Sequence, residues 1–197
     1  AKPGYYAPST VGQADVISRA LTQAKVHPDS ISFVEAHGTG TALGDPIEVA
    51  ALTQAYRAHE VGRQYCALGS IKSNIGHMDT AAGLAGVIKA ALALEQGVLP
   101  PTINVQRPNP KLRLAESPFF LATEQYVLAP RAVPHRAGVS SFGIGGTNTH
   151  AILEQVRRKS ADARGTSGAV HVFPLSARSE QRLRAQAQTL LDFLPRL

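Results

Sequence analysis

The 197-residue sequence has little cysteine, few aromatic side chains and no tryptophan. Its single cysteine, Cys66, excludes a disulfide framework within the chain and a zinc site built from several cysteines. Aromatic residues make up only 6% of the chain, whereas glycine (17) and proline (13) are frequent, which favours close backbone packing over bulky cores. No apolar run is long and uncharged enough to predict a membrane span. Since residues 1–5 lack the hydrophobic stretch of a secretory signal, we expect a cytoplasmic protein.

Charge is distributed unevenly along the sequence. Residues 1–156 carry 12 Lys and Arg against 11 Asp and Glu, whereas residues 157–197 carry 8 against 3. The basic residues of the second segment are not interleaved with aromatic side chains, which argues against a nucleic-acid-binding protein. A solvated surface is the simpler explanation of this segment, and docking of an acidic partner is the alternative.

Apolar periodicity predicts the order helix, strand, helix, strand, helix, followed by several strands. This order is typical of helices layered on a mixed sheet. The first two strands are expected at 31–36 and 66–71, and a helix at about 80–96 is small or apolar on every face, which predicts burial on all sides. Two short strands at 119–123 and 126–128 are expected to pair with each other, and two longer strands are expected at 138–142 and 147–156, joined by a glycine turn.

The composition changes to Arg, Lys, Ser, Gly and Thr at residues 157–169, which predicts a linker. A strand at 170–175 and a helix at about 179–194 with leucines on one face are expected beyond it. The sequence therefore predicts a main domain over 1–156 and the start of a second subdomain over 170–197.

Three polar, glycine-rich loops follow expected strands, at residues 37–41, 72–77 and 142–148. Two of them carry histidines, His37 and His77, at the carboxyl ends of strands, where open α/β sheets bind ligands. Two imidazoles directed at one carbonyl oxygen could stabilise an oxyanion or an enolate. The alternative for each histidine alone is a structural residue with its hydrogen bonds satisfied.

These loops resemble the motifs of β-ketoacyl synthases, in the same order and spacing. The matching segments are residues 35–41 (EAHGTGT) with 44–48 (GDPIE), then 72–77 (KSNIGH) and 141–148 (SFGIGGTN). The similarity is greatest to the ketosynthase domain of modular polyketide synthases and covers about residues 5–156. The resemblance implies an α/β fold, the C-terminal half of a thiolase-like layered α/β/α/β/α fold, followed by a small α/β linker subdomain.

The family's chemistry is a decarboxylative Claisen condensation of acyl and malonyl-type thioesters carried on the phosphopantetheine of an acyl carrier protein. By resemblance, His37 and His77 bind the extender carbonyl and stabilise the enolate, and Lys72 orients the site through an acidic partner. Asp45 is the candidate partner, and the alternative role for Asp45 is a helix cap. The resemblance implies no metal and no cofactor bound to the chain itself.

The same resemblance assigns binding roles in the glycine-rich loops. Thr39 and Thr41 are expected to hydrogen-bond the pantetheine arm, and Phe142 and Ile144 to line its site. The backbone N–H of Ile144 is expected to form part of the oxyanion hole. The partners implied are an acyl carrier protein and a second copy of the complete domain in a homodimer.

The nucleophilic cysteine of the family has no counterpart motif in this sequence. Cys66 falls inside an expected strand, so we interpret Cys66 as a small buried apolar residue. The nucleophile is therefore expected from an N-terminal half of the ketosynthase. The alternative function is a non-condensing module that binds carrier-linked acyl groups, transfers acyl groups or serves as a structural half-domain.

Overall fold

The computed structural model describes residue 4 and residues 7–59, 61–156 and 174–193. Its contacts divide the chain into two compact units, residues 1–157 and 158–197. The expected linker at 157–169 lies outside the described residues, and the predicted boundaries at its two ends stay predictions.

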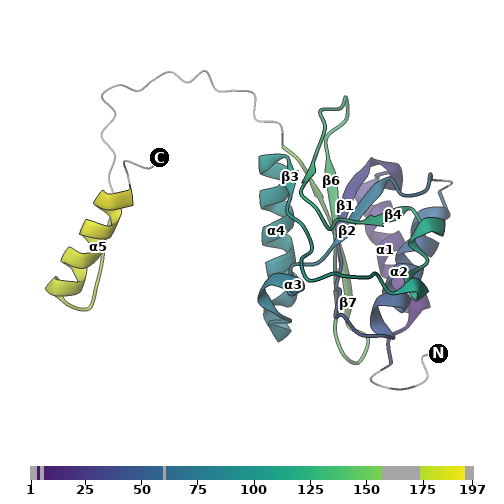
Figure 1. Ribbon diagram of the computed structural model, residues 1–197, viewed down its shortest axis with the longest axis horizontal. Helices are drawn as coiled ribbons and strands as arrows, with labels where there is room; N and C mark the ends of the chain where they lie inside the picture. The colour runs from purple at the N-terminus through teal and green to yellow at the C-terminus, as the bar shows by residue number, and fades with distance from the viewer. Residues whose placement is uncertain (1–3, 5–6, 60, 157–173, 194–197) are drawn as a thin grey trace. The chain divides into compact units, whose positions relative to one another are not determined.

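The first unit is built on a mixed five-stranded sheet in the order β4-β2-β1-β6-β7 (Figure 1). The first four of these strands are parallel to their neighbours, and β7 runs antiparallel to β6. Every residue of β1 and β2 is buried, which explains why neither strand alternates polar and apolar side chains; Ser32 and Glu35 are buried polar residues of β1. The strands are β1 (Ile31–Glu35), β2 (Cys66–Gly69), β4 (Phe119–Leu121), β6 (Arg136–Phe142) and β7 (Asn148–Glu154).

Helices cover both faces of this sheet, as Figure 1 shows. On one face lie α1 (Thr10–Ala24), which the Ser9 hydroxyl caps by accepting the Gly12 N–H, and α2 (Gly44–Arg57). On the other face lies α4 (Ala82–Gln96), which ends at Gly97 with a φ of 69°. The two cores contain Ile17, Leu21, Val34, Leu52 and Tyr56 on the first face, and Phe33, Ala90, Leu94 and Val139 on the second.

The prediction that strands 119–123 and 126–128 pair with each other is wrong. The first becomes β4, which pairs with β2. The second becomes β5 (Tyr126–Val127), which pairs antiparallel with β3 (Val98–Leu99) in a separate small sheet. Sequence neighbours were expected to form a hairpin, but β4 instead completes the edge of the parallel sheet beside β2. By contrast, the two longer strands expected on either side of the glycine turn form as β6 and β7, and they pair antiparallel.

The helix expected at 80–96 forms as α4, and the described residues bury one of its faces. Short side chains such as Ala90 and Ala93 bury one face of α4 against the sheet. On its opposite face Leu84, Ile88 and Leu92 are 68%, 61% and 53% exposed. The chain itself therefore covers only one side of an otherwise apolar helix.

The second unit contains α5 (Glu180–Phe193), which confirms the helix expected there. Most of the strand expected at 170–175 lies outside the described residues, and Pro174 and Leu175 are not in a strand. In neither described unit is there a helix with the length and apolar character needed to cross a membrane.

The sheet register brings three loops to one edge. Glu35 at the end of β1 is paired with Gly69 at the end of β2, so the segments after these strands leave the sheet side by side. On the other side of β1, Glu35 is paired with Val139, and β6 continues from there to Phe142. The remaining connections are α3 (Lys72–Ile75) and the 3-10 turns Pro28–Ser30, Asp79–Ala81, Pro110–Leu112 and Leu114–Glu116.

Candidate active site

Two histidines meet at this sheet edge. His37 follows β1 by two residues, and His77 follows β2 and the short helix α3. Their ring centroids are 5.3 Å apart, and the ring planes cross at 84°. The ring of Phe142, at the end of β6, lies 5.8 Å from that of His37. The three loops singled out in the sequence therefore converge.

The backbone of the first histidine loop is held by the buried carboxylate of Glu48 on α2. Its Oε1 accepts the His37 N–H at 2.7 Å, and its Oε2 accepts the Gly38 N–H at 2.9 Å. Burial raises the pKa of Glu48 to about 7, although the two N–H groups act to lower it. Glu48 thus anchors the loop to α2 in a region that excludes water.

Gly38 is required at the tightest point of this loop. Its φ is 50°, and a Cβ at this position would lie 2.7 Å from the Cβ of Ser70 in the neighbouring loop. A side chain here would push the two loops apart. The absence of a side chain at Gly38 thus allows the His37 loop and the segment leading to His77 to touch.

Asp45 was the expected acidic partner of Lys72, but other acids influence the pKa of this lysine. Asp45 Oδ1 accepts the N–H of Gly40, and no Asp45–Lys72 ion pair is found among the described residues. Burial lowers the pKa of Lys72, while the charges of Glu48 and Glu35 raise it. Asp45 does not cap α2 either, since α2 begins one residue before it without a side-chain cap. Glu48, one helical turn further along α2, is the acid whose carboxylate bonds to the backbone of the histidine loop.

The same surroundings keep His37 neutral at physiological pH. Burial lowers the pKa of His37 to about 4, and the neighbouring Lys72 and His77 act in the same direction. His37 Nδ1 is buried and has no hydrogen-bond partner in the part of the chain that the structure describes. A buried imidazole nitrogen without a partner is costly, so this atom is a ready site for a ligand or another protein segment.

The other residues expected to bind substrate surround the histidines on exposed loops. Thr39 and Thr41 have their hydroxyl oxygens 3.1 Å apart, and Thr41 accepts the Gly44 N–H. The side chain of Ile144 is 69% exposed in the turn between β6 and β7, two residues after the buried Phe142. Their placement around one sheet edge leaves these side chains accessible to a ligand arriving from solvent.

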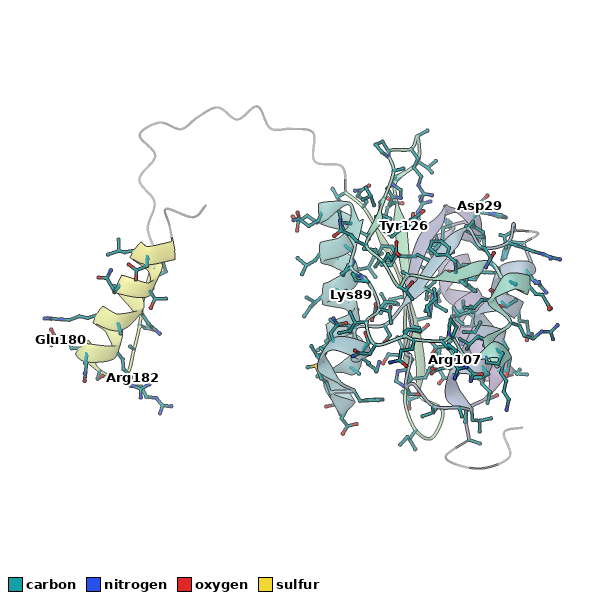
Figure 2. The ribbon with its side chains drawn as sticks, in the orientation of Figure 1. Asp29, Lys89, Arg107, Tyr126, Glu180 and Arg182 are labelled. Atoms are coloured by element: carbon teal, nitrogen blue, oxygen red, sulfur yellow. The ribbon has the colours of Figure 1, made fainter. Side chains whose placement is uncertain are left out.

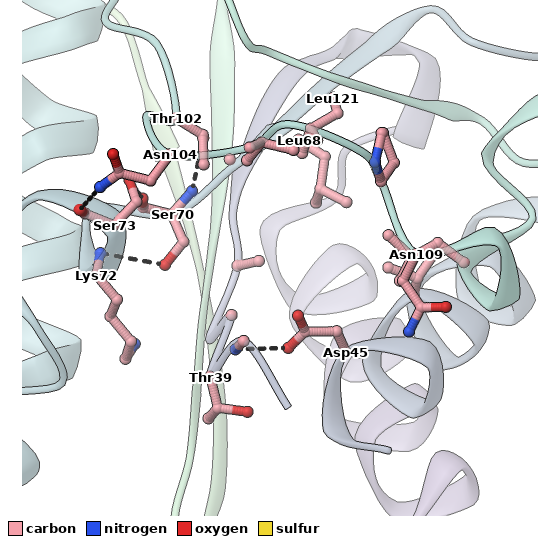
Figure 3. A pocket seen from close by; sticks show the side chains of 18 of the residues that line it. Thr39, Asp45, Leu68, Ser70, Lys72, Ser73, Thr102, Asn104, Asn109 and Leu121 are labelled. Carbon is pink, nitrogen blue, oxygen red and sulfur yellow. Dashed lines mark hydrogen bonds between the residues drawn. The ribbon is translucent and has the colours of Figure 1, made fainter. Parts of the chain in front are cut away.

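A pocket of about 660 Å³ adjoins the histidine loops (Figure 3). Figure 3 shows Lys72 on one side of this pocket and Asp45 on the other, with Ser70 and Thr102 between β2 and the loop that follows α4. Neither histidine lines the pocket, although Gly38 and Thr39 of the first histidine loop and Lys72 of the second segment do. No cluster of three or more His, Cys, Asp or Glu residues that could hold a metal ion is found in the described ranges.

Cys66 lies at the opposite end of its strand from the histidine loop. It is the first residue of β2, it is fully buried, and burial raises the pKa of its thiol. A protonated thiol enclosed in the core is a poor nucleophile. This placement agrees with the interpretation of Cys66 as a small apolar residue.

Comparison with known proteins assigns the family. A family model described as "Beta-ketoacyl synthase, C-terminal domain" matches residues 1–106, and one described as "Ketoacyl-synthetase C-terminal extension" matches residues 108–195. The chain belongs to the β-ketoacyl synthase family. Polyketide synthase PksN of Bacillus subtilis (strain 168) is 47% identical to this ketosynthase segment over 194 residues. Polyketide synthase PksL of the same strain is 43% identical over 204 residues.

Solved ketosynthases have the same fold as this segment. Ketosynthase twelve from the bacillaene polyketide synthase in Bacillus amyloliquefaciens superimposes with a TM-score of 0.87 at 51% identity. The ketosynthase from module 1 of the bacillaene synthase from Bacillus amyloliquefaciens FZB42 gives 0.85 at 47% identity. These matches confirm the predicted resemblance and the thiolase-like fold class.

The ketosynthase segment spans only part of its relatives. The match to PksN covers 98% of the segment but 4% of PksN, and the match to PksL covers 97% of the segment but 4% of PksL. In the two ketosynthase structures the segment spans 33% and 34% of the chain, with 98% and 100% of its own residues covered.

Three charged residues at or beneath the site were not recognised from the sequence: Glu48, Glu35 and Lys89, which forms a buried ion pair with Glu35. Glu35 ends a fully buried strand, and Lys89 interrupts an apolar helix. One acidic residue in a buried strand and one basic residue in an apolar helix could have suggested a Glu35–Lys89 ion pair, because charged side chains are rarely buried without a partner.

Proposed function

We propose that this segment supplies the two histidines of a polyketide β-ketoacyl synthase that carries out decarboxylative Claisen condensation. The observation that carries the proposal is that His37 and His77 lie with their ring centroids 5.3 Å apart at the carboxyl ends of the parallel strands β1 and β2. This spacing allows both imidazoles to reach one thioester oxygen. The substrates are acyl and malonyl-type thioesters carried on the phosphopantetheine of an acyl carrier protein.

The proposed reaction proceeds in two steps. The bond between the malonyl carboxylate and the adjacent carbon breaks, carbon dioxide leaves, and the bonding electrons form an enolate with negative charge on the thioester oxygen. The enolate carbon then attacks the acyl thioester held on a cysteine. A carbon–carbon bond forms, the carbon–sulfur bond breaks, and the sulfur leaves as a thiolate.

His37 and His77 stabilise the charge that develops in the first step. Because the pKa of His37 is lowered to about 4, its ring is neutral near pH 7 and can donate one N–H hydrogen bond without acting as an acid. Lys72 adds a positive charge beside the same loops. Preorganised donors of this kind are worth roughly 3–4 kcal/mol each in other enzymes.

The remaining part of the ketosynthase is proposed to supply the cysteine and to cover α4. The apolar face formed by Leu84, Ile88 and Leu92 is 53–68% exposed in this chain. The segment accounts for about a third of the ketosynthase structures that it matches, so most of such a domain lies outside it. A second layer from that polypeptide would bury this face and carry the nucleophile toward the histidines; the complete domain is proposed to be a homodimer.

The pantetheine arm is proposed to lie along the exposed loops of this edge. Thr39 and Thr41 present hydroxyl groups there, and Phe142 and Ile144 border the same region from the end of β6. The Ile144 N–H is proposed as a donor of the oxyanion hole for the acyl thioester. The non-condensing and purely structural alternatives gain no support from the comparisons.

The test replaces each histidine in the complete ketosynthase that contains this segment. His37→Ala and His77→Ala should each lower carbon dioxide release from a malonyl-loaded carrier protein by about 100-fold or more. Acylation of the nucleophilic cysteine, measured by intact mass, reports on the other half-reaction. Carbon dioxide release at the normal rate in both variants would overturn the proposed function.

A second histidine pair provides the matched control. His27 and His59 lie with their ring centroids 5.4 Å apart at 88°, nearly the geometry of the proposed site. His27 lies just before β1, at the opposite end of that strand from His37. His27→Ala and His59→Ala should therefore leave carbon dioxide release unchanged.

A further inference from the structure

A buried ion pair lies beneath the histidine loops. Lys89 Nζ on α4 is 2.6 Å from Glu35 Oε2 at the end of β1, and the two side chains are only 7% and 2% exposed. Figure 2 shows Lys89 on the side of α4 that faces the sheet. Neither residue lines the adjoining pocket or takes part in the chemistry proposed above.

The second oxygen of Glu35 connects this ion pair to the other histidine loop. Glu35 Oε1 accepts the backbone N–H of Ile71 at 2.6 Å. Ile71 immediately precedes Lys72, and the same segment leads to His77 six residues later. Since Glu35 itself lies two residues before His37, one carboxylate is linked covalently to the first histidine loop and by a hydrogen bond to the second.

Helix α4 connects the His77 segment to the ion pair, because it follows His77 in the chain and carries Lys89. His77 is followed by a single 3-10 turn and then by α4, which carries Lys89. A Cβ at Gly86, one turn before Lys89, would lie 3.1 Å from Glu35 Cγ. The missing side chain at Gly86 thus lets α4 approach Glu35 closely enough for Lys89 to reach it.

Burying these two charged groups costs free energy, because both lose their hydration by water. Burial raises the pKa of Glu35, and the charge and hydrogen bond of Lys89 act against that rise, so Lys89 favours the ionised carboxylate. Replacing a buried ion pair by well-packed apolar side chains is often neutral or stabilising in proteins. An ionised carboxylate, however, makes a stronger bond to the Ile71 N–H than an apolar or neutral group could.

We propose that Glu35 and Lys89 are positioning residues that fix the separation between the His37 and His77 loops. The proposal rests on the proposed function of the two histidines and adds a specific device that sets their geometry. Neither residue touches substrate in this assignment. Their effect is exerted through the N–H of Ile71 and the start of α4, which together determine where His77 lies relative to His37.

The main test is the double variant Glu35→Leu with Lys89→Met in the complete ketosynthase. This change removes both charges together and keeps side chains of similar size, so the protein should stay folded. The kcat for carbon dioxide release from malonyl-loaded carrier should fall by about 10- to 100-fold, since small displacements of catalytic groups have effects of this size. The KM for the loaded carrier and the acylation of the cysteine should change little.

A matched control lies at the opposite end of the same strand. Ser32 is buried on β1, and its hydroxyl is 2.7 Å from His135 Nδ1. Ser32→Ala removes a buried polar contact without touching either histidine loop. Its melting temperature should fall while its kcat for carbon dioxide release stays at the wild-type value, which separates loss of stability from loss of positioning.

Glu35→Gln gives a second, milder variant that keeps an acceptor for Ile71. Its kcat should fall by less than that of the double variant, and the conservative variant Lys89→Arg, which keeps the positive charge beside Glu35, should retain most of the rate. Wild-type kcat in the folded double variant, or in Glu35→Gln if the double variant does not fold, would overturn the positioning role. If carbon dioxide release survives in His37→Ala and His77→Ala, the proposed function fails; if it is lost there but kept in the Glu35 variants, only the positioning role fails.

Discussion

Glu48 offers a direct test of the electrostatics beneath the first histidine loop. Glu48 is 4% exposed, and its carboxylate accepts hydrogen bonds from the N–H groups of His37 and Gly38. These bonds favour the ionised form, whereas burial disfavours it, and burial is the larger effect because the pKa rises from 4.5 to about 7. In the folded protein the Glu48 carboxyl group should therefore stay protonated between pH 4.5 and about 7, where the unfolded chain has lost this proton.

The sign of the resulting pH dependence follows from this difference. Below pH 4.5 Glu48 is protonated in both states. Between pH 4.5 and about 7 only the unfolded chain releases the proton, so the free energy of unfolding falls as pH rises and levels off above pH 7. A pKa raised from 4.5 to about 7 corresponds to a change of about 3 kcal/mol.

The measurement compares urea unfolding of the complete ketosynthase and of its Glu48→Gln variant from pH 4.5 to 8. The glutamine does not titrate, and its NH₂ group faces one backbone N–H, which costs roughly 1–3 kcal/mol at every pH. The stability advantage of the wild type over Glu48→Gln should shrink by about 3 kcal/mol across this range. Val49→Ala, a destabilising change beside it without a titratable group, should show a constant difference. An advantage that stays constant or grows for Glu48 would refute the dominance of burial.

Three further outcomes are expected. Cys66→Ser should leave acyl loading of the complete ketosynthase intact, because the thiol is enclosed at the start of β2; lost loading by intact mass would make Cys66 the nucleophile. Gly38→Ala should destabilise by about 1–3 kcal/mol more than Gly40→Ala, since both have positive φ but only a Cβ at Gly38 would strike Ser70; equal falls in melting temperature would contradict this. The segment expressed alone should bind a hydrophobic dye, less so with Ile88→Gln; a dye-free, cooperatively melting monomer would show that α4 needs no cover.

Local sequence was sufficient to predict the elements that carry the site. The buried strand 31–35 is a short apolar run, and the helix ending at Gly97 has a stop signal that the backbone uses, with a φ of 69°. The loops of His37 and His77 could be located at strand ends, because a change from apolar to glycine-rich polar sequence marks where a strand stops. Their convergence followed from a general property of parallel sheets rather than from either motif alone.

Contacts between distant residues could not be predicted in the same way. Asp45 was the expected partner of Lys72, but the carboxylates whose charges act on Lys72 are Glu48 and Glu35. Which acid reaches the site depends on how α2 docks on the sheet, and a displacement of one helical turn is enough to exchange Asp45 for Glu48. The pairing of β4 with β2 likewise depends on the sheet edge available after β1 and β2 have assembled.

The amino-acid sequence by itself determined the main strands and helices around the site and singled out the two histidines, since periodicity, glycine and proline act over a few residues. It did not predict the one-turn helix α3 in the segment 72–77, which was expected to be a loop. Only the tertiary structure decided that His37 is neutral, that Glu48 holds its loop and that Glu35 joins Lys89 to the backbone of Ile71. Proton affinities and buried ion pairs depend on the exclusion of water by segments far apart in the chain, and that exclusion exists only after they have packed.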